Sequence, residues 1–189
     1  MCARYYIEPK DSHLKELQSL ADIRQREKSV SEKIKTSGEV FPTDLVYVMV
    51  APGQYQAMSW GFSSFSKRPI INARYETLNE KPLFKEHATA HRCLAPASGF
   101  YEWAKTDKQK IKYRIFLAEH SLFLAGCYRQ EANSSFCHFV IITKDADENI
   151  AFIHDRMPLI IPGALTEEWL KGEPLDLFYQ GPLLEYQIV

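Results

Sequence analysis

Four strand-like segments follow one another between residues 92 and 146, and no helical segment separates them. They read RCLAPASGFYEWAK, KYRIFLAEH, LFLAGCYRQ and CHFVIITKDA, and are rich in the β-branched and aromatic residues that favour strands. The pieces that join them, TDKQKI, EHS and EANSS, are short enough for hairpins. Because parallel strands need long crossovers, this order predicts a mostly antiparallel sheet in an α+β domain rather than a doubly wound one. We expect the sheet to curl toward a barrel with peripheral helices.

The remaining segments fit one β-rich domain over residues 1–189, a length that allows a sizeable core. A leucine stripe predicts a helix that begins near Ser12 within residues 12–34, with a solvated or loop-like far end, and LTEEWLK predicts a short helix capped by Thr166. The other predicted elements are strands over 44–52, 55–62, 156–162 and 183–189 and a helix over 81–88.

Charge and cysteine usage limit the function classes. The net charge is −1, so a nucleic-acid partner needs a local basic patch that acidic residues elsewhere offset. No apolar run of about 18 residues is present, which predicts a cytoplasmic protein with no membrane partner. The four cysteines show no C-x-x-C spacing, so we expect no metal site and no cofactor. Cys93, Cys127 and Cys137 are expected to be buried free thiols.

Cys2 stands directly behind the initiator methionine. If Met1 is removed, this residue carries a thiol and a free amine on adjacent carbons, with reference pKa values of about 8.5 and about 7.7–8.0. Such a 1,2-aminothiol traps aldehydes as five-membered rings. The plain alternative is an ordinary residue of a frayed terminus, and this stretch alone favours that alternative.

Several polar residues lie among apolar neighbours, namely Asn72 and Arg74 in INARYET, Glu102 in SGFYEW and His154 in FIHDRMP. Taken singly, these residues have structural interpretations: alternation would place Glu102 outward on its strand, His154 could be a core histidine, and Arg74 could form a surface ion pair. The nearby Trp60 and Trp103 could likewise belong to the core. Together, however, a thiol, a carboxamide, a carboxylate and an imidazole are the parts of a covalent acid–base site. Arginines beside tryptophans are the parts of a surface for phosphates and bases.

The motifs MCARY, WGF, NARYET, RCLAPASGFYEW, AGCY, FVIITKDA and HDRMP occur in this order over nearly the whole chain. Their combination resembles the SRAP family of SOS-response-associated peptidases, or abasic-site-processing proteins. This chain departs from the usual pattern at Ala3, where glycine is usual, at Tyr75, where serine is usual, and in SSFSKRP, which lacks a tryptophan.

The resemblance implies a β-rich α+β domain that binds single-stranded DNA and bonds an exposed N-terminal cysteine to abasic sites. The nucleophile is then Cys2, Asn72 positions it, and Glu102 and His154 form the acid–base pair. The residues implied to contact DNA are Arg4, Trp60, Phe62, Arg74, Trp103, Thr143 and Arg156, with Lys67, Arg68 and Arg92 as weaker candidates for phosphate contacts.

The predicted chemistry is a thiazolidine crosslink between Cys2 and the aldehyde of an abasic site, which protects the site during the DNA damage response. Autoproteolysis and strand cleavage by β-elimination are further activities, and the expected species is a monomer that joins the nucleoid when bound to DNA. Two alternatives stay open: a thiol peptidase that uses Cys2, His154 and Glu102, and a non-catalytic module that binds single strands.

Overall fold

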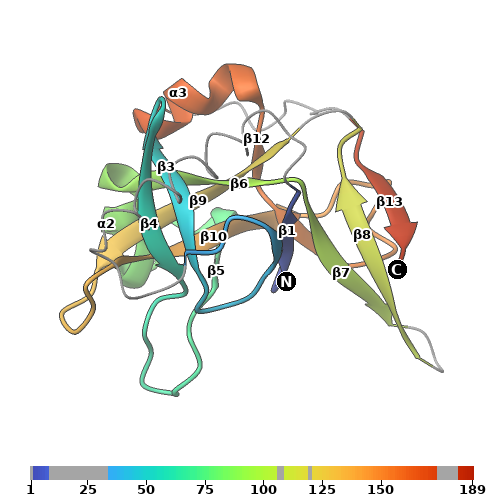
Figure 1. Cartoon of the computed structure of the whole chain (residues 1–189), viewed down its shortest axis with the longest axis horizontal. Coiled ribbons are helices and arrows are strands. Elements are labelled where there is room, and N and C mark those ends of the chain that lie inside the picture. Colours follow the sequence, from blue (N-terminus) through green and yellow to red (C-terminus); the bar gives the residue numbers. More distant parts are fainter. Residues whose placement is uncertain (1, 9–33, 106–108, 119–120, 174–182) are drawn as a thin grey trace.

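The computed structural model describes residues 2–8, 34–105, 109–118, 121–173 and 183–189. The chain forms two sheets (Figure 1), and both contribute to the same cluster of buried apolar residues. Residues of both sheets meet there, among them Tyr5 and Phe100 from one sheet and Trp60 and Phe139 from the other. The predicted β-rich α+β, barrel-like fold is confirmed.

The smaller sheet has five strands in the order β13, β8, β7, β1, β2, and each neighbouring pair is antiparallel. Their bounds, in that order, are Glu185–Ile188, Lys110–Phe116, Gly99–Lys105, Tyr5–Ile7 and Gly38–Val40. This sheet carries the N-terminal strand in its interior, between β7 and β2.

The larger sheet closes on itself. Its strands follow the order β11, β10, β4, β3, β6, β9, β12, and β9 pairs again with β10, so that β10, β4, β3, β6 and β9 form a closed barrel. The short β5 also pairs with β10, and the pairings of β10 with β4 and β5 are parallel. The bounds are β3 Leu45–Ala51, β4 Gln54–Trp60, β5 Asn72–Arg74, β6 Arg92–Ala97, β9 Leu122–Gln130, β10 Cys137–Asp145, β11 Arg156–Pro158 and β12 Ile160–Ile161.

The glycine of the AGCY motif lies where the barrel closes. Gly126 on β9 pairs with Ile141 on β10. A Cβ at this position would lie 2.7 Å from the Val140 carbonyl oxygen and 3.0 Å from Cys93 Sγ. Only glycine therefore permits this approach of the two strands.

The helices lie outside the barrel wall, α2 over Pro82–Ala90 and α3 over Thr166–Leu170, with short 3₁₀ turns at Tyr75–Thr77 and Gly163–Leu165. Both predicted short helices are confirmed, but the predicted cap of α3 is wrong. Thr166 is the first helical residue, and its hydroxyl donates to the Gly163 carbonyl at 2.9 Å. The helix predicted over residues 12–34 lies, apart from Ile34, outside the described residues.

The longest predicted strand is two strands. RCLAPASGFYEWAK divides at Ser98, so that β6 joins the barrel and β7 joins the five-stranded sheet. The chain can change sheets here because the Ser98 amide donates to the Tyr6 carbonyl and the Ser98 hydroxyl accepts from the Glu8 amide. Backbone groups that leave one ladder thereby find partners in another strand.

Candidate active site

Cys2 lies just before β1 with its side chain fully buried. The Asn72 side-chain amide donates to the Cys2 carbonyl at 2.8 Å, which joins β5 of the larger sheet to the N-terminal segment. The Cys2 thiol lies 3.8 Å from the Arg4 carbonyl oxygen. Burial, followed by the charge of Glu102, raises the pKa of the Cys2 thiol to about 12. The expectation of an exposed cysteine is therefore wrong for this state, because the thiol packs into the core cluster.

Glu102 points into the protein rather than outward. On β7, alternate residues Phe100, Glu102 and Ala104 are buried, whereas Tyr101 and Trp103 face the other side. The structural interpretation that placed Glu102 outward is therefore wrong, since Glu102 shares a face with Phe100. Only 4% of the residue is exposed, and burial raises the pKa of its carboxyl group while the charge of His154 partly opposes the rise.

His154 follows a turn at residues 148–153 and precedes β11. Its Nδ1 accepts a hydrogen bond from the Arg156 amide at 3.0 Å, and an Asp155 carboxylate oxygen lies 2.7 Å from the same nitrogen. The first contact requires an unprotonated Nδ1 and the second a protonated one, so the two are alternatives. Neutral His154 in the first arrangement carries its proton on Nε2.

The fold thus gathers the four residues expected to carry the chemistry. Asn72 is hydrogen-bonded to Cys2, Glu102 acts electrostatically on Cys2, and His154 acts electrostatically on Glu102. They come from β5, the segment before β1, β7 and the segment before β11. A buried carboxyl beside a thiol and an imidazole is a combination suited to proton transfer.

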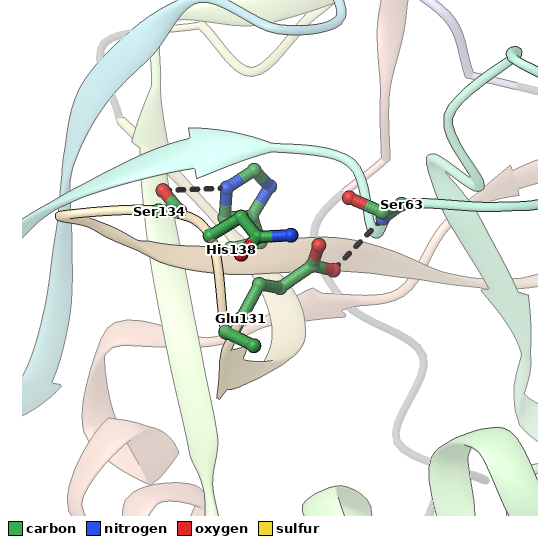
Figure 2. Close-up of a pocket in the computed structure, with 6 residues that line it drawn as sticks. Ser63, Glu131, Ser134 and His138 are labelled. Carbon is green, nitrogen blue, oxygen red and sulfur yellow. Dashed lines mark hydrogen bonds between the residues drawn. The ribbon is translucent and has the colours of Figure 1, made fainter.

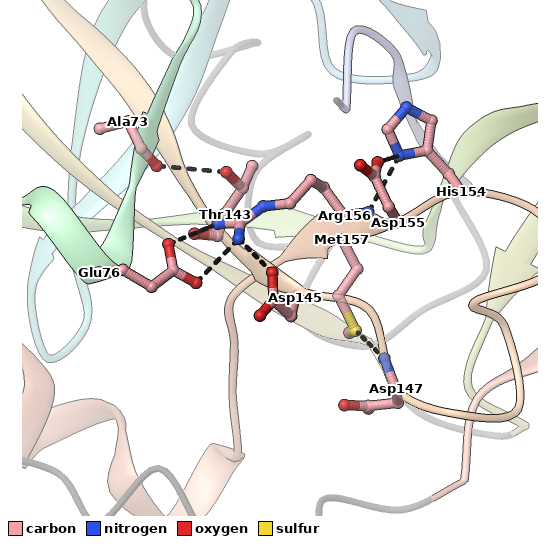
Figure 3. A network of polar contacts seen from close by, with 9 residues as sticks. All are labelled: Ala73, Glu76, Thr143, Asp145, Asp147, His154, Asp155, Arg156 and Met157. Carbon is pink, nitrogen blue, oxygen red and sulfur yellow. Dashed lines mark hydrogen bonds and ion pairs between the residues drawn. The ribbon is translucent and has the colours of Figure 1, made fainter.

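Arg156 forms the centre of a polar network at the end of β10 (Figure 3). Its guanidinium donates to both carboxylate oxygens of Glu76 at 2.8 and 2.7 Å and to Asp145 at 2.5 Å. It also donates to the carbonyl of Thr143 at 2.7 Å, and the Thr143 hydroxyl donates to the Ala73 carbonyl at 3.3 Å. The two carboxylates occupy the donors that a phosphate would need, and with burial opposing they raise the pKa of Arg156.

The other two arginines that we expect to contact phosphate, Arg4 and Arg74, differ in whether their side chains already have partners. Arg4 donates to Glu39 at 3.1 Å and lies over the rings of Phe41 and Trp103. Arg74 is exposed at the end of β5, opposite Thr143 on β10.

Arg92 plays a structural part in this state. Its side chain donates to the carbonyls of Ala88 and Glu173 at 2.8 and 2.9 Å and lies over the Trp169 ring. It holds the end of α2 against α3, since Ala88 belongs to α2 and Trp169 to α3. This arrangement leaves its guanidinium little room for a phosphate.

Trp60 and Phe62 belong to the core. Both are fully buried, Trp60 donates to the Ile71 carbonyl at 3.0 Å, and its ring packs against Tyr5 and Phe139. A buried ring offers no face to a base, so of the three aromatic residues expected to touch DNA only the half-buried Trp103 presents one in this structure.

The loop between β4 and β5 presents a residue that the motif comparison passed over. Phe65 is fully exposed, and Lys67 and Arg68 beside it are exposed as well. Lys67 adopts a φ of 62°, which turns the chain at this tip. The sequence feature that could have indicated Phe65 is SSFSKRP, in which an aromatic residue stands among serines and is followed by two cations.

A cavity of about 420 Å³ lies at the turn between β9 and β10 (Figure 2). His138 donates through Nδ1 to the Gly61 carbonyl at 2.8 Å and meets the Ser134 hydroxyl at 3.0 Å, while Glu131 accepts from the Ser63 amide at 2.8 Å. None of the predicted site residues lines this cavity, whose lining is Ser63, Glu131, Ala132, Asn133, Ser134 and His138.

The described residues offer neither a cluster of three or more metal ligands nor a helical membrane span. No group of three or more histidine, cysteine, aspartate or glutamate residues among them is arranged to hold a metal ion. Over the same residues, no helix combines the length and apolar character needed to span a membrane.

Solved structures share this fold. A protein from Bacteroides thetaiotaomicron matches with a TM-score of 0.75 and 21% identity, covering 100% of this chain and 92% of that one. A phage-related protein from Bordetella bronchiseptica matches with a TM-score of 0.71 and 22% identity, covering 100% and 94%.

Curated relatives carry one description. The abasic site processing protein YoqW of Bacillus subtilis is 42% identical over 122 residues, which are 61% of this chain and 54% of the relative. YedK of Escherichia coli, with the same description, is 33% identical over 119 residues, 60% of this chain and 54% of the relative. The corresponding HMCES protein of Xenopus tropicalis is 31% identical over 147 residues, 60% and 44%. The chain spans about half the length of these relatives.

A family model described as SOS response associated peptidase (SRAP) matches residues 1–180. Because this match spans nearly all of the sequence, from the MCARY motif past HDRMP, the chain belongs to the SRAP family.

Proposed function

We propose that this chain processes abasic sites in single-stranded DNA by forming a covalent crosslink through Cys2. The observation that carries the proposal is the position of Cys2, whose backbone is fixed by Asn72 and whose thiol feels the charge of the buried Glu102 carboxyl group. The curated relatives described as abasic site processing proteins support it.

The reaction begins once Met1 has been removed and the α-amine of Cys2 is free. The amine adds to the C1′ aldehyde of the opened sugar, and the resulting carbinolamine loses one water to give an imine. The thiol then adds to the imine carbon, and its proton moves to the nitrogen. One C–N and one C–S bond form and one water leaves, which gives a thiazolidine.

Both steps need proton transfer. Water can leave the carbinolamine only after its hydroxyl group is protonated, and the raised pKa of the Cys2 thiol keeps the thiol neutral near neutral pH until it adds to the imine. Glu102 and His154 form the acid–base pair that moves these protons. Asn72 holds the Cys2 backbone, so that amine and thiol approach the same carbon, and such alignment contributes much of the rate in intramolecular reactions. An imine at C1′ also acidifies C2′, which makes strand cleavage by β-elimination a side reaction.

DNA contacts surround this centre in the proposal. Arg74 is the exposed phosphate contact, with no ion pair among the described residues, and Arg4 and Arg156 contact phosphate by leaving their carboxylate partners. Phe65 and Trp103 present aromatic faces to bases. Affinity for a single strand should therefore fall as salt rises, despite the net charge of −1.

The two alternatives make different demands. A thiol peptidase needs a cysteine whose pKa is lowered so that thiolate is present, and burial does the opposite at Cys2. In the proposal, autoproteolysis is limited to the single release of Met1, which requires no turnover of other substrates. A binding module without chemistry would bind single strands equally well as Cys2→Ala and give no adduct.

The aldehyde is the part of the substrate to test. Purified protein is mixed with a single strand carrying an abasic site and analysed on a denaturing gel. The matched control strands carry either a sugar reduced to the alcohol or a tetrahydrofuran analogue, which cannot form an imine. The proposal predicts a denaturant-stable adduct with the aldehyde strand alone. Equal adduct on the control strands, or none on any strand, would refute it.

A further inference from the structure

The C-terminal end of α2 carries two histidines that stand four residues apart, in the stretch HATAH. The helix ends at Ala90, and His91 caps it. The His91 amide still donates to the His87 carbonyl at 2.9 Å, so the last turn keeps the helical spacing. Residues at this spacing lie one turn apart on the same face of a helix, and the two imidazoles are therefore neighbours.

The two imidazoles meet through one nitrogen each. Nδ1 of His87 lies 3.4 Å from Nδ1 of His91, and the ring centroids lie 5.6 Å apart. Both side chains are half-buried, whereas Phe84 and Ala88 of the same helix are buried. The pair thus stands at the border between the buried face of α2 and the solvent, where an ion can reach it.

The distance between the two nitrogens distinguishes two interpretations. A hydrogen bond between the rings is the plain one, but 3.4 Å lies beyond the usual range of about 2.7–3.2 Å for an N–H donor. Two nitrogens bound to one tetrahedral zinc ion at about 2.0–2.1 Å lie about 3.3–3.4 Å apart. Neighbouring ligands of an octahedral ion at the same bond length lie only about 2.8–3.0 Å apart. The separation therefore fits a tetrahedral ion.

Neighbouring rings hold both imidazoles in place. Phe62 meets His87 edge-on with 6.0 Å between ring centroids, and Tyr128 packs against His91 at 5.3 Å. The Tyr128 amide also donates to the His91 carbonyl at 2.9 Å, which ties this end of α2 to β9. Ligand side chains that are held by packing lose little conformational freedom when an ion binds.

The charges around the pair are compatible with a bound cation. The C-terminal end of a helix carries partial negative charge, and the pair stands at that end of α2. Arg129 acts on His87 electrostatically and lies over the ring of Phe62 at 4.3 Å, but its guanidinium is paired with Glu131 at 2.9 Å. Glu86, which is exposed beside His87, adds negative charge.

We propose that His87 and His91 bind one Zn²⁺ ion through their Nδ1 atoms, with water in the two remaining tetrahedral positions. Imidazole is a ligand that suits zinc, and two histidines at i and i+4 on one helix recur in zinc sites. Water completes the site because the described residues bring no third ligand side chain to it. Neither histidine, at the end of α2 outside the barrel wall, is assigned to the reaction or to DNA, so the inference stands independently of the proposed function (Figure 1).

Titration of the metal-free protein with zinc chloride, followed by calorimetry, tests the site. The parent should bind one Zn²⁺ per chain, and its melting temperature should rise by about 5–10 °C at a free zinc concentration about 100-fold above Kd. His87→Ala and His91→Ala should each weaken binding at least about tenfold, because each removes one of the two ligands. The matched control is Thr89→Ala, which changes an exposed residue between the two histidines and keeps both ligands.

Nuclear magnetic resonance of the parent locates the ion without any substitution. The imidazole signals of two histidines should move on addition of zinc, while those of the other four of the six histidines stay in place. Zinc bound as tightly by His87→Ala/His91→Ala as by the parent would overturn the proposal, as would a parent that binds no zinc or moves other imidazole signals. His87→Ala should crosslink an abasic strand as the parent does, so a parent that forms no adduct would count against the proposed function alone.

Discussion

The surroundings of Cys2 and the barrel wall around Cys93 and Cys127 both bury a thiol completely. Burial raises the pKa of Cys2 and of Cys127 to about 12, and that of Cys93 well above its usual value. Neither depth nor acidity of the thiol therefore distinguishes the two regions. They differ in their partners, because Cys2 has Asn72 and Glu102 whereas Cys93 lies against Gly126 in the wall. In the proposed function, the reactivity of Cys2 therefore follows from its position behind Met1 and from its polar neighbours.

The largest expected effect separates the two regions directly. Cys2→Ala should form no crosslink with an abasic strand, because neither ring closure nor a stable sulfur bond remains. Cys127→Ala should crosslink at a rate within about twofold of the parent. A substitution in the core away from the site lowers the stability of the fold and leaves the reacting groups in place. Adduct yield against time on denaturing gels measures both. Loss of the adduct in both variants would show that the surroundings of Cys2 are not what determines crosslinking.

The next effect concerns the carboxyl group that only the Cys2 region has. Glu102→Gln should slow crosslinking about 10²–10⁴-fold, the usual contribution of a general acid or base. Because burial raises the pKa of Glu102, the parent rate should change across a pH range above that of an ordinary glutamate. This pH dependence of the crosslinking rate should be missing in the variant. If it persists in Glu102→Gln, the titrating group is not Glu102.

The same substitution, Glu102→Gln, should slow crosslinking but raise the stability of the fold. The folded-state pKa of Glu102 lies above its unfolded value, so the folded protein binds more protons and its free energy of unfolding falls as pH rises through that range. Glu102→Gln removes this loss and should stabilise the protein by about 1 kcal/mol at neutral pH. Chemical denaturation at low and neutral pH tests this. Destabilisation by Glu102→Gln at neutral pH would contradict this prediction, because it would mean that the ionised carboxylate stabilises the fold.

The smallest effect concerns the Arg156 network. Glu76→Gln removes one of the two carboxylates that hold Arg156 and should raise affinity for a single strand about threefold, the scale of a weak ion pair. Glu167→Gln is the matched control, because Glu167 pairs with Lys171 on α3. Equal gains in the two variants would show that the change in net charge alone is responsible.

The sequence predicted the strands well where alternation and hairpin spacing were clear, as over 122–130, which is β9. It could not show that 92–105 divides between two sheets at Ser98, because that change of partner depends on the hydrogen bonds that Ser98 donates to Tyr6 and accepts from Glu8. Barrel closure through Gly126 is likewise a contact between strands and not a local pattern.

At the site, the motifs predicted residues that the fold brings together, but not their surroundings. The inward direction of Glu102 follows from its parity with Phe100, which was present in the sequence. Burial of Trp60 and Phe62 could not be predicted in this way, since each packs in a cluster of residues from distant elements, Trp60 between the two sheets and Phe62 against α2. The carboxylates that hold Arg156 were part of the quoted motifs NARYET and FVIITKDA, yet their pairing required three dimensions.

The most direct measurement is the mass of the N-terminal peptide after reaction with an abasic strand. Cleavage after Arg4 should release Cys2–Arg4 without Met1, joined to the sugar with loss of one water and with no thiol left to alkylate. This result is what a thiazolidine at Cys2 requires. An adduct that retains Met1, keeps an alkylatable Cys2 thiol, or maps to a lysine would contradict the account.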